Sequence, residues 1–503
     1  LGIEFIYIHT LVVFFILAAY IDNRPKFTPW MGNTFQLRKE AIKLGGQYKV
    51  FEKWSQEYKT NILGLKLGSE LVVVALSHAL VREVHRNEVF EGRPNTFFLR
   101  LRTMGTRLGI TCTDGKLWHE HRNFAMKQLR HVGYCKNQME QHIQMEANSL
   151  TQFIEGINEH PVWPGSFLAP SVINVLWSLT AGKRIDREDR QLVHLLDLLN
   201  KRSKVFDLCG GLLTQFPWLR FIFPNRTGYN LIQQLNRELH CFFMETIEDH
   251  KKSITAENNE SDFIYVYIKE MQKNNALKNT TFNETQMTMT ILDFFIAGSQ
   301  TTSNTIDLAI MMLALKKEFQ QRIHKEITDV LNNRNEKYIP LSSRSFLPLL
   351  DAYIMEIQRF FHIVPISGPR RALWDTKLGG YNIPKNTTIL IGLQSVLMDK
   401  DHWRDPENFR PERFLDDEGK IINDEYFIPF GQGRRRCLGD ALARSCLFSF
   451  LVAIVQRFRI EYEGVETANQ FQLLPGITLS PKPYKVRFIK RNLNPLITNI
   501  STK

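Results

Sequence analysis

The chain has 503 residues, of which 43% are hydrophobic and 23% are charged, a composition typical of a globular protein with a large core. Its 64 basic and 52 acidic residues leave a net charge of +12, which fits an anionic membrane surface, an acidic protein partner or nucleic acid. The sequence lacks zinc-ligand spacings and dense basic tracts, so we expect no nucleic acid partner. Six scattered cysteines do not form a disulfide framework, and we expect them all to be reduced.

Phe5–Ile21 is an apolar segment that only His9 and Thr10 interrupt, and it is just long enough to span a bilayer. Basic residues and prolines follow it, without the small-residue site at which a signal peptide would be cleaved. We therefore predict a membrane anchor at residues 1–22, a Pro/Gly linker at 23–34, one domain at 35–491 and a C-terminal tail at 492–503.

Gly64–Leu80 alternates and is rich in β-branched residues, which predicts a small β-sheet. The segment Phe90–Pro94 should then close a helix and begin an irregular stretch that reaches to about Gly109.

Trp118 and Arg122 lie four residues apart, so they share one face of a predicted helix. On this spacing alone, a core tryptophan and a surface arginine are the simpler interpretation. His119 and His121 fall on other faces of the helix, and we expect both to be solvated.

The pattern from Asn137 to Lys317 is mainly helical, and within it Leu212–Pro224 is unusually aromatic for a connecting segment. This segment could be part of the core. It could equally be an apolar loop that dips into a bilayer.

Thr285–Leu315 is predicted to be one long helix, whose polar residues, Asp293 among them, argue against a membrane span. At its middle lies Ala297–Thr302, where Gly298 costs helix propensity and suggests that another group approaches the helix closely. Thr301 could simply donate a hydrogen bond back to the helix.

Glu356 and Arg359 lie three apart on another predicted helix, where they can form an ion pair. On the pattern alone this pair could be an ordinary surface salt bridge.

The segment Phe430–Gly439 contains three glycines, three arginines and one cysteine, Cys437, directly before the apolar helical run Ala441–Val455. Backbone N–H groups, cationic side chains and a helix N-terminus would lower the pKa of this thiol and let it bind a metal. A buried free cysteine in a basic turn is the alternative.

This loop resembles the heme-binding loop of the cytochrome P450 superfamily at each fixed position, namely Phe430, Gly433, Arg435, Cys437 and Gly439. The other patterns also occur in the order that the superfamily shows, and the sequence is similar to insect microsomal members of the family-two clan. The resemblance implies a mainly α fold with a small β-rich lobe, the cytochrome P450 fold. It also implies heme b (iron protoporphyrin IX) between the long helix and the cysteine loop.

By this resemblance Cys437 is the axial ligand of the iron, and Thr301 and Gln300 manage protons as catalytic residues. Gln300 departs from the family, because the residue before the threonine is usually Asp or Glu and an amide cannot ionise. Glu356, Arg359 and Arg413 of the segment Pro411–Phe414 are expected to form a buried trio. The remaining residues implied to contact the cofactor are Arg435, Trp118, Arg122, Arg370, Arg93, Phe430, Gly431 and Ala297.

The implied reaction is monooxygenation of a lipophilic substrate by O₂, at the cytosolic face of the endoplasmic reticulum membrane. Electrons would come from NADPH through a flavoprotein reductase, with cytochrome b5 as a further candidate donor. The substrate would be a terpenoid or lipid hormone precursor or a xenobiotic. A basic face for the reductase would comprise Lys127, Arg130, Arg434 and Arg436.

The expected apolar pocket is closed by the turn Phe471–Ile477. Its other residues are Phe97, Phe98, Leu99, Phe294, Phe295, Ile366 and Leu474. Two alternatives are a heme-thiolate isomerase or dehydratase that needs no reductase, which Gln300 keeps open, and a heme-thiolate sensor without enzymatic activity.

Overall fold

The computed structural model of the protein describes residues 31–205, 211–254, 261–274, 280–334, 338–465 and 471–492. The α-helices are α2 (Thr34–Leu44), α3 (Gln47–Glu57), α4 (His78–Arg86), α5 (Phe97–Arg102), α6 (Gly115–His131), α7 (Asn137–Gly156), α8 (Leu168–Ala181), α9 (Arg190–Val205), α10 (Gly211–Gln215), α11 (Leu219–Ile222), α12 (Tyr229–Ser253), α13 (Phe263–Asn274), α14 (Glu284–Leu315), α15 (Lys317–Arg334), α16 (Pro348–Phe361), α17 (Leu393–Leu397), α18 (Lys400–Trp403) and α19 (Asp440–Arg457). Short 3₁₀ helices are η1 (Glu88–Phe90), η2 (Pro164–Ser166), η3 (Leu341–Phe346) and η4 (Pro411–Phe414). The strands are β1 (Ile62–Leu67), β2 (Glu70–Ala75), β3 (Ile366–Arg371), β4 (Thr376–Leu378), β5 (Tyr381–Ile383), β6 (Thr388–Gly392), β7 (Phe458–Glu463), β8 (Leu473–Leu474), β9 (Ser480–Pro481) and β10 (Lys485–Lys490).

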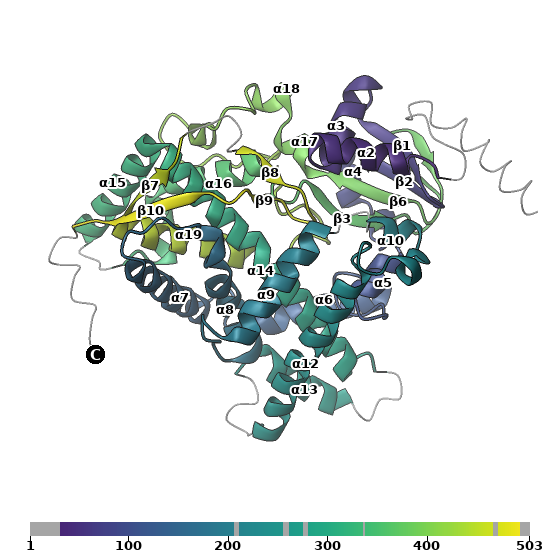
Figure 1. Ribbon diagram of the computed structural model, residues 1–503, viewed down its shortest axis with the longest axis horizontal. Coiled ribbons are helices and arrows are strands. Elements are labelled where there is room, and N and C mark those ends of the chain that lie inside the picture. The colour runs from purple at the N-terminus through teal and green to yellow at the C-terminus, as the bar shows by residue number, and fades with distance from the viewer. Residues whose placement is uncertain are drawn as a thin grey trace, which may run out of the picture.

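The helices outweigh the strands, which confirms the predicted mainly α fold with a small β-rich lobe. That lobe lies at one end of the molecule, where α2, α3 and α4 surround the sheet (Figure 1). Its sheet has the strand order β1-β2-β6-β3, with β2 and β6 parallel and the other neighbours antiparallel. The short sheet predicted over Gly64–Leu80 is therefore present, but it ends earlier, because the Ser77 side chain accepts a hydrogen bond from the Leu80 N–H and caps α4.

The predicted long helix is confirmed as α14, which has 32 residues and runs through the middle of the helical body (Figure 1). Asn283 caps its N-terminus by accepting a hydrogen bond from Gln286 N–H at 2.9 Å. The Tyr353 hydroxyl of α16 donates to the Ala309 carbonyl of α14 at 2.7 Å. Asn304 donates to the Leu479 carbonyl at 3.0 Å, which fixes α14 against the turn between β8 and β9.

Two expectations about the N-terminal half need correction. The stretch expected to be irregular between Phe90 and Gly109 contains the helix α5, which the Thr96 side chain caps. His121 is buried rather than solvated, and its Nε2 lies 3.1 Å from the Thr281 hydroxyl. The loop before α14 folds over this face of α6, which local spacing could not indicate.

No helix among the described residues combines the length and the apolar character needed to cross a membrane. The anchor predicted at residues 1–22 lies outside the described residues. The five cysteines that the structure describes are free, as expected.

Candidate active site

The cysteine loop lies directly before α19 and is closed by a hydrogen bond from Cys437 N–H to the Phe430 carbonyl at 3.0 Å. Gly433 has a φ of +70°, and a Cβ there would lie 2.1 Å from the His85 carbonyl oxygen. Only glycine fits this position, because both the backbone conformation and the close approach of α4 exclude a side chain. The glycines of the motif therefore seat the loop against the β-rich lobe.

Cys437 is accessible to solvent, although protein atoms surround most of its thiol. Burial raises the pKa of its thiol, while the Gly439 N–H and the Arg122 guanidinium favour the thiolate. The expected lowering of the pKa is thus wrong for the protein without metal, because loss of hydration outweighs the nearby positive charges. A bound metal would favour the thiolate, because it takes the place of the thiol proton.

The middle of α14 opens onto an internal space. Ala297 is exposed although the helix around it, including Phe295 and Ser299, is buried. The Thr301 hydroxyl donates to the Ala297 carbonyl at 2.9 Å, so both residues lie on this open face. Gly298 faces away from it, since a Cβ there would lie 2.5 Å from Cδ2 of Leu176 in α8.

Trp118 and Arg122 on α6 lie beside the cysteine loop. The Arg435 guanidinium stacks on the buried Trp118 ring at 3.7 Å from its centroid, and that of Arg122 lies at 5.8 Å. Arg435 also donates from Nη2 to the carbonyls of Glu91 and Thr113, each at 2.8 Å. The structure therefore brings together three predicted residues from α6 and the cysteine loop.

Arg93 and Arg370 complete a cationic cluster with Arg122 and Arg435. Arg93 donates to the carbonyls of Gly368 and Pro369 at 2.8 and 2.6 Å. Among the described residues, the buried Nε atoms of Arg93, Arg370 and Arg435 have no hydrogen-bond partner. These orphaned donors need acceptors that the described protein does not supply.

The pKa values of the cluster show the same imbalance. Burial and the neighbouring Arg93 and Arg370 lower the pKa of Arg435 to about 7. Burial and Arg93 lower the pKa of Arg370 well below its usual range. The nearby carboxylate of Asp114 is already shared between Arg107 and Arg371, at 3.0 and 2.8 Å. The cluster therefore holds buried positive charge that favours an anion.

The predicted trio of Glu356, Arg359 and Arg413 is buried beneath the helical body. Arg359 donates to both carboxylate oxygens of Glu356 at 2.7 and 2.9 Å, and Arg413 adds a bond at 3.2 Å. Arg359 further donates to the carbonyls of Leu397 and Pro406. The trio thus connects α16 to the loops that follow it through hydrogen bonds and ion pairs.

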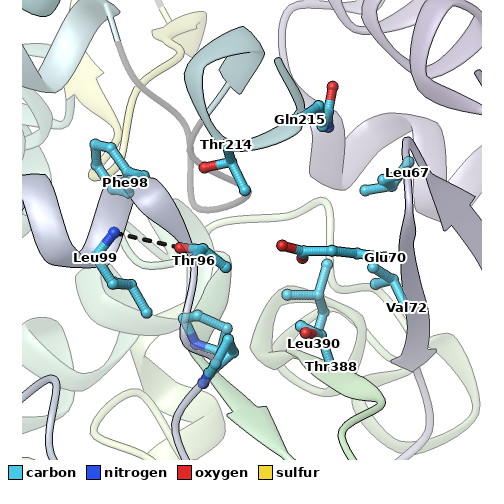
Figure 2. Close-up of a pocket in the computed structure, with 12 residues that line it drawn as sticks. Leu67, Glu70, Val72, Thr96, Phe98, Leu99, Thr214, Gln215, Thr388 and Leu390 are labelled. Atoms are coloured by element: carbon cyan, nitrogen blue, oxygen red, sulfur yellow. Dashed lines mark hydrogen bonds between the residues drawn. The ribbon is translucent and has the colours of Figure 1, made fainter. Parts of the chain in front are cut away.

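Two pockets lie where the β-rich lobe meets the helical body, and no residue of α14 is among those that line them. Phe98 and Leu99 of α5 line the first of them, opposite Leu67 and Leu390 of the β-rich lobe (Figure 2). Ile366 lines the second, together with residues of the turn between β8 and β9. Of the residues expected to line the apolar pocket, the structure thus places Phe98, Leu99 and Ile366 in these two pockets.

Phe294 and Phe295 do not line these pockets. The Phe294 ring packs edge-on against Phe263, and the Phe295 ring packs among Trp177 and Phe243 in the core. The prediction for these two residues is wrong, because they point to the sides of α14 that α8, α12 and α13 cover.

The sequence model of the Cytochrome P450 family matches residues 23–488. The chain belongs to the cytochrome P450 family. It is 61% identical over 472 residues to "Probable cytochrome P450 305a1" of Drosophila melanogaster, which covers 93% of this chain and 94% of that protein. It is 35% identical over 491 residues to "Farnesoate epoxidase" of Bombyx mori, covering 96% and 98%. It is 33% identical over 495 residues to "Cytochrome P450 2J1" of Oryctolagus cuniculus, covering 95% of each.

As a cytochrome P450 the chain is a heme-dependent oxidoreductase, a monooxygenase that uses O₂, a lipophilic substrate and a redox partner. The family binds heme b through a cysteine thiolate. Heme b carries two carboxylates, and the cationic cluster has the unpaired guanidinium donors to receive them. The residues present therefore fit the cofactor that the family implies.

Two contributors to this site were missing from the sequence interpretation. Asp114 organises the cluster by accepting from Arg93 N–H at 2.8 Å and pairing with Arg107 and Arg371. Its place directly before a glycine at the start of α6 is a signal of a helix start, but it does not indicate these partners. His85 lies against the cysteine loop with neither ring nitrogen bonded among the described residues, and no local pattern marks it.

Proposed function

We propose that this cytochrome P450 inserts one oxygen atom of O₂ into a terpenoid or related lipophilic substrate, by hydroxylation or epoxidation. A xenobiotic substrate is the second candidate. The main support is the cluster of unpaired arginines beside the cysteine loop, together with the open face in the middle of α14. The epoxidase name of the Bombyx mori relative favours the terpenoid class.

In this proposal Cys437 ligates the iron, and Arg93, Arg122, Arg370, Arg435 and Trp118 hold the two heme carboxylates. The bound cofactor supplies dioxygen activation, which the thiolate ligand promotes. The loop residues Phe430 and Gly431 and the helix residue Ala297 complete the walls around it.

Proton delivery falls to the open face of α14. The Thr301 hydroxyl can turn between the Ala297 carbonyl and a group in the open space, since a hydroxyl both donates and accepts. The half-buried Gln300 can hold a water molecule but cannot ionise. We accordingly propose Thr301 and Gln300 as the catalytic residues that the chain itself supplies.

The proposed electron donor is an NADPH-dependent flavoprotein reductase, with cytochrome b5 as a second donor. Of the predicted basic face, Arg434 and Arg436 pair with Glu88 and Asp440. Lys127 and Arg130 on α6 carry no ion pair among the described residues, which leaves them to meet an acidic partner.

The proposed location is the cytosolic face of the endoplasmic reticulum membrane. Besides the predicted anchor, the support is a patch of exposed apolar side chains on and beside α11, here called the α11 patch. Its members are Trp218, Phe221, Ile222 and Phe223, exposed by 55%, 75%, 58% and 46%.

The experiment for the proposed function is Cys437→Ala. Reduced wild-type protein with carbon monoxide should show the Soret band of a thiolate-ligated heme, and the variant should lose it while keeping its far-UV circular dichroism. Cys241→Ser, which changes an exposed cysteine of α12, is the matched control and should keep the band. A thiolate band in the Cys437→Ala protein would contradict the assignment.

Activity with NADPH, reductase and O₂ separates the proposed monooxygenase from a reductase-independent isomerase or dehydratase. Product should form from a terpenoid or xenobiotic panel only when all three are present. Conversion of a peroxide substrate without reductase would favour the alternative.

A further inference from the structure

Arg202, near the C-terminal end of α9, is a buried arginine with only 5% of its surface exposed. Among the described residues it forms no hydrogen bond and no ion pair. The guanidinium carbon lies 6.0 Å from the centroid of the Phe98 ring. That distance is at the outer limit of a cation–π contact, so it does not account for the burial of a charge.

The surroundings of Arg202 hold more positive than negative charge. Arg102 lies nearby and is already paired with Asp293 at 2.6 Å. The same Asp293 carboxylate accepts from the N–H groups of Ile110 and Thr111 at 2.7 and 2.8 Å, so its acceptors are taken. Burial raises the pKa of the neighbouring Cys112 thiol, which therefore stays neutral. Within the part of the chain that the structure describes, the buried guanidinium of Arg202 is left without a counterion.

This charge lies beside the pockets rather than in the core. Phe98 lines the pocket of Figure 2, and the residues after Arg202 pack on the turn that closes the second pocket. The Ser203 carbonyl accepts from Ile477 N–H at 3.0 Å within that turn. Leu479 of the same turn accepts from Asn304 of α14, one helical turn beyond Thr301. Arg202 therefore lies between residues that line the two pockets, on a helix that contacts α14.

Burial together with Arg102 lowers the pKa of Arg202 to about 9, so the side chain is still charged at neutral pH. A buried charge without a partner is costly, and chains keep one where a ligand supplies the counterion. Planar guanidinium groups bind carboxylates through two parallel hydrogen bonds.

We propose that Arg202 binds the carboxylate of the substrate, which makes lipophilic carboxylic acids the preferred substrate class. The apolar chain of the acid would extend over Phe98 toward the face of Ala297 and Thr301. This inference rests on the proposed monooxygenase function and specifies its substrate. Arg202 would act as a specificity residue that fixes one end of the substrate and so selects the carbon that is oxidised.

The test measures binding to the full-length ferric holoenzyme by isothermal titration calorimetry, without turnover. The probes are two matched pairs: dodecanoic acid with methyl dodecanoate, and citronellic acid with its methyl ester. Each ester keeps the chain and removes the charge. Wild-type protein should bind each acid at least about tenfold more tightly than its ester, the preference expected of a charge-assisted bidentate contact.

Arg202→Gln should remove this preference, and Arg202→Lys should retain part of it because the charge remains. The matched control is Lys201→Gln on the same helix, where an exposed lysine pairs with Asp197 at 2.6 Å. It removes the same charge from the outer face of α9 and should leave the preference unchanged. The reduced carbon monoxide spectrum of each variant checks that its heme site is intact.

Equal binding of acid and ester by the wild type, failure of both acids to bind, or an unchanged preference in Arg202→Gln would overturn the inference. Each of these results is compatible with a normal thiolate Soret band, in which case the proposed function stands. Loss of that band in the wild type would instead remove the proposed function itself.

Discussion

At the scale of single residues, neighbouring arginines of the heme site differ in whether the protein neutralises them. Asp114 satisfies Arg371 and Arg107, whereas the Nε atoms of Arg370 and Arg435 are buried without partners among the described residues. The positive charges of the first pair are thus neutralised within the protein. Those of the second pair remain available to an anionic cofactor. Arg202 is a similar case near the proposed substrate site. Asp293 pairs with Arg102, and Arg202 has no counterion among the described residues.

Gln300 is the residue at which this chain departs from the family pattern. An amide at this place can position water beside Thr301 but cannot pass a proton by ionising. Proton transfer by a positioned ionisable group is typically worth about 10²–10⁴-fold in rate. Slow turnover or leakage of peroxide on loosely bound substrates is the expected consequence.

Gln300→Glu should raise the fraction of NADPH consumption that appears as product, and Thr301→Ala should lower it. Both are measured with reductase, O₂ and one well-bound substrate, by quantifying NADPH, peroxide and product together. Ser299→Ala, on the buried side of α14, is the control for a small change in the same turn and should leave the ratio unchanged. Equal coupling in the wild type and Gln300→Glu would show that a water chain already suffices.

At the scale of elements, α14 is held by hydrogen bonds on the sides that face away from its open surface. One of them involves Asp307, which is buried and accepts from the Tyr484 hydroxyl at 2.6 Å and from Trp163 Nε1 at 3.2 Å. Burial raises its pKa from the usual 3.8 to about 7, despite these donors. The neutral acid can donate to Tyr484, whose hydroxyl in turn lies 2.6 Å from the Asp307 carbonyl.

Asp307→Asn should remove a pH dependence of stability. Between pH 3.8 and about 7 the unfolded chain has lost a proton that the folded protein still binds at Asp307, so the wild type loses stability as pH rises through that window. The upper limit of the loss is about 4 kcal/mol, from 1.36 kcal/mol for each pKa unit. Asparagine mimics the neutral acid, so the variant should be more stable than the wild type at pH 8 and similar to it at pH 4.

Urea unfolding of both holoproteins at several pH values measures this difference, and taking the difference cancels the titration of the histidines. Asp249→Asn, an exposed aspartate of α12 that lies 3.7 Å from Lys183, is the control and should not change the profile. A constant difference between wild type and Asp307→Asn across this range would contradict the raised pKa.

The sequence predicted those features that depend on local order along the chain. The long α14, the cysteine loop and the ion pair of Glu356 with Arg359 each follow from spacing within a few residues. The features that it missed depend on contacts between distant segments. His121 is buried by a loop whose Thr281 lies 160 residues away, and the partner of Asp114 on β3 lies 257 residues away. Such contacts between distant segments also determine which guanidinium groups remain unpaired.

At the scale of the whole molecule, the α11 patch lies beside α10, whose Thr214 and Gln215 line the pocket of Figure 2. Arg220 stacks on Phe97 and Phe221 at 4.8 and 4.2 Å, which places positive charge at the edge of the apolar surface. Apolar side chains rimmed by cations suit an anionic membrane surface.

The last prediction concerns this second membrane contact. A holoprotein that lacks residues 1–24 should still bind vesicles of phosphatidylcholine and phosphatidylserine, and Phe221→Ser with Ile222→Ser should weaken that binding at least about tenfold. The estimate assumes that each side chain loses about half of the 1.5–3 kcal/mol that full burial of a large apolar side chain contributes. Cosedimentation with the vesicles measures the bound fraction.

Phe346→Ser in η3 is the matched control, because that ring is 50% exposed but lies against Arg334, away from α11. The contact is refuted if the truncated protein stays entirely in the supernatant, or if the control weakens binding as much as the double variant does.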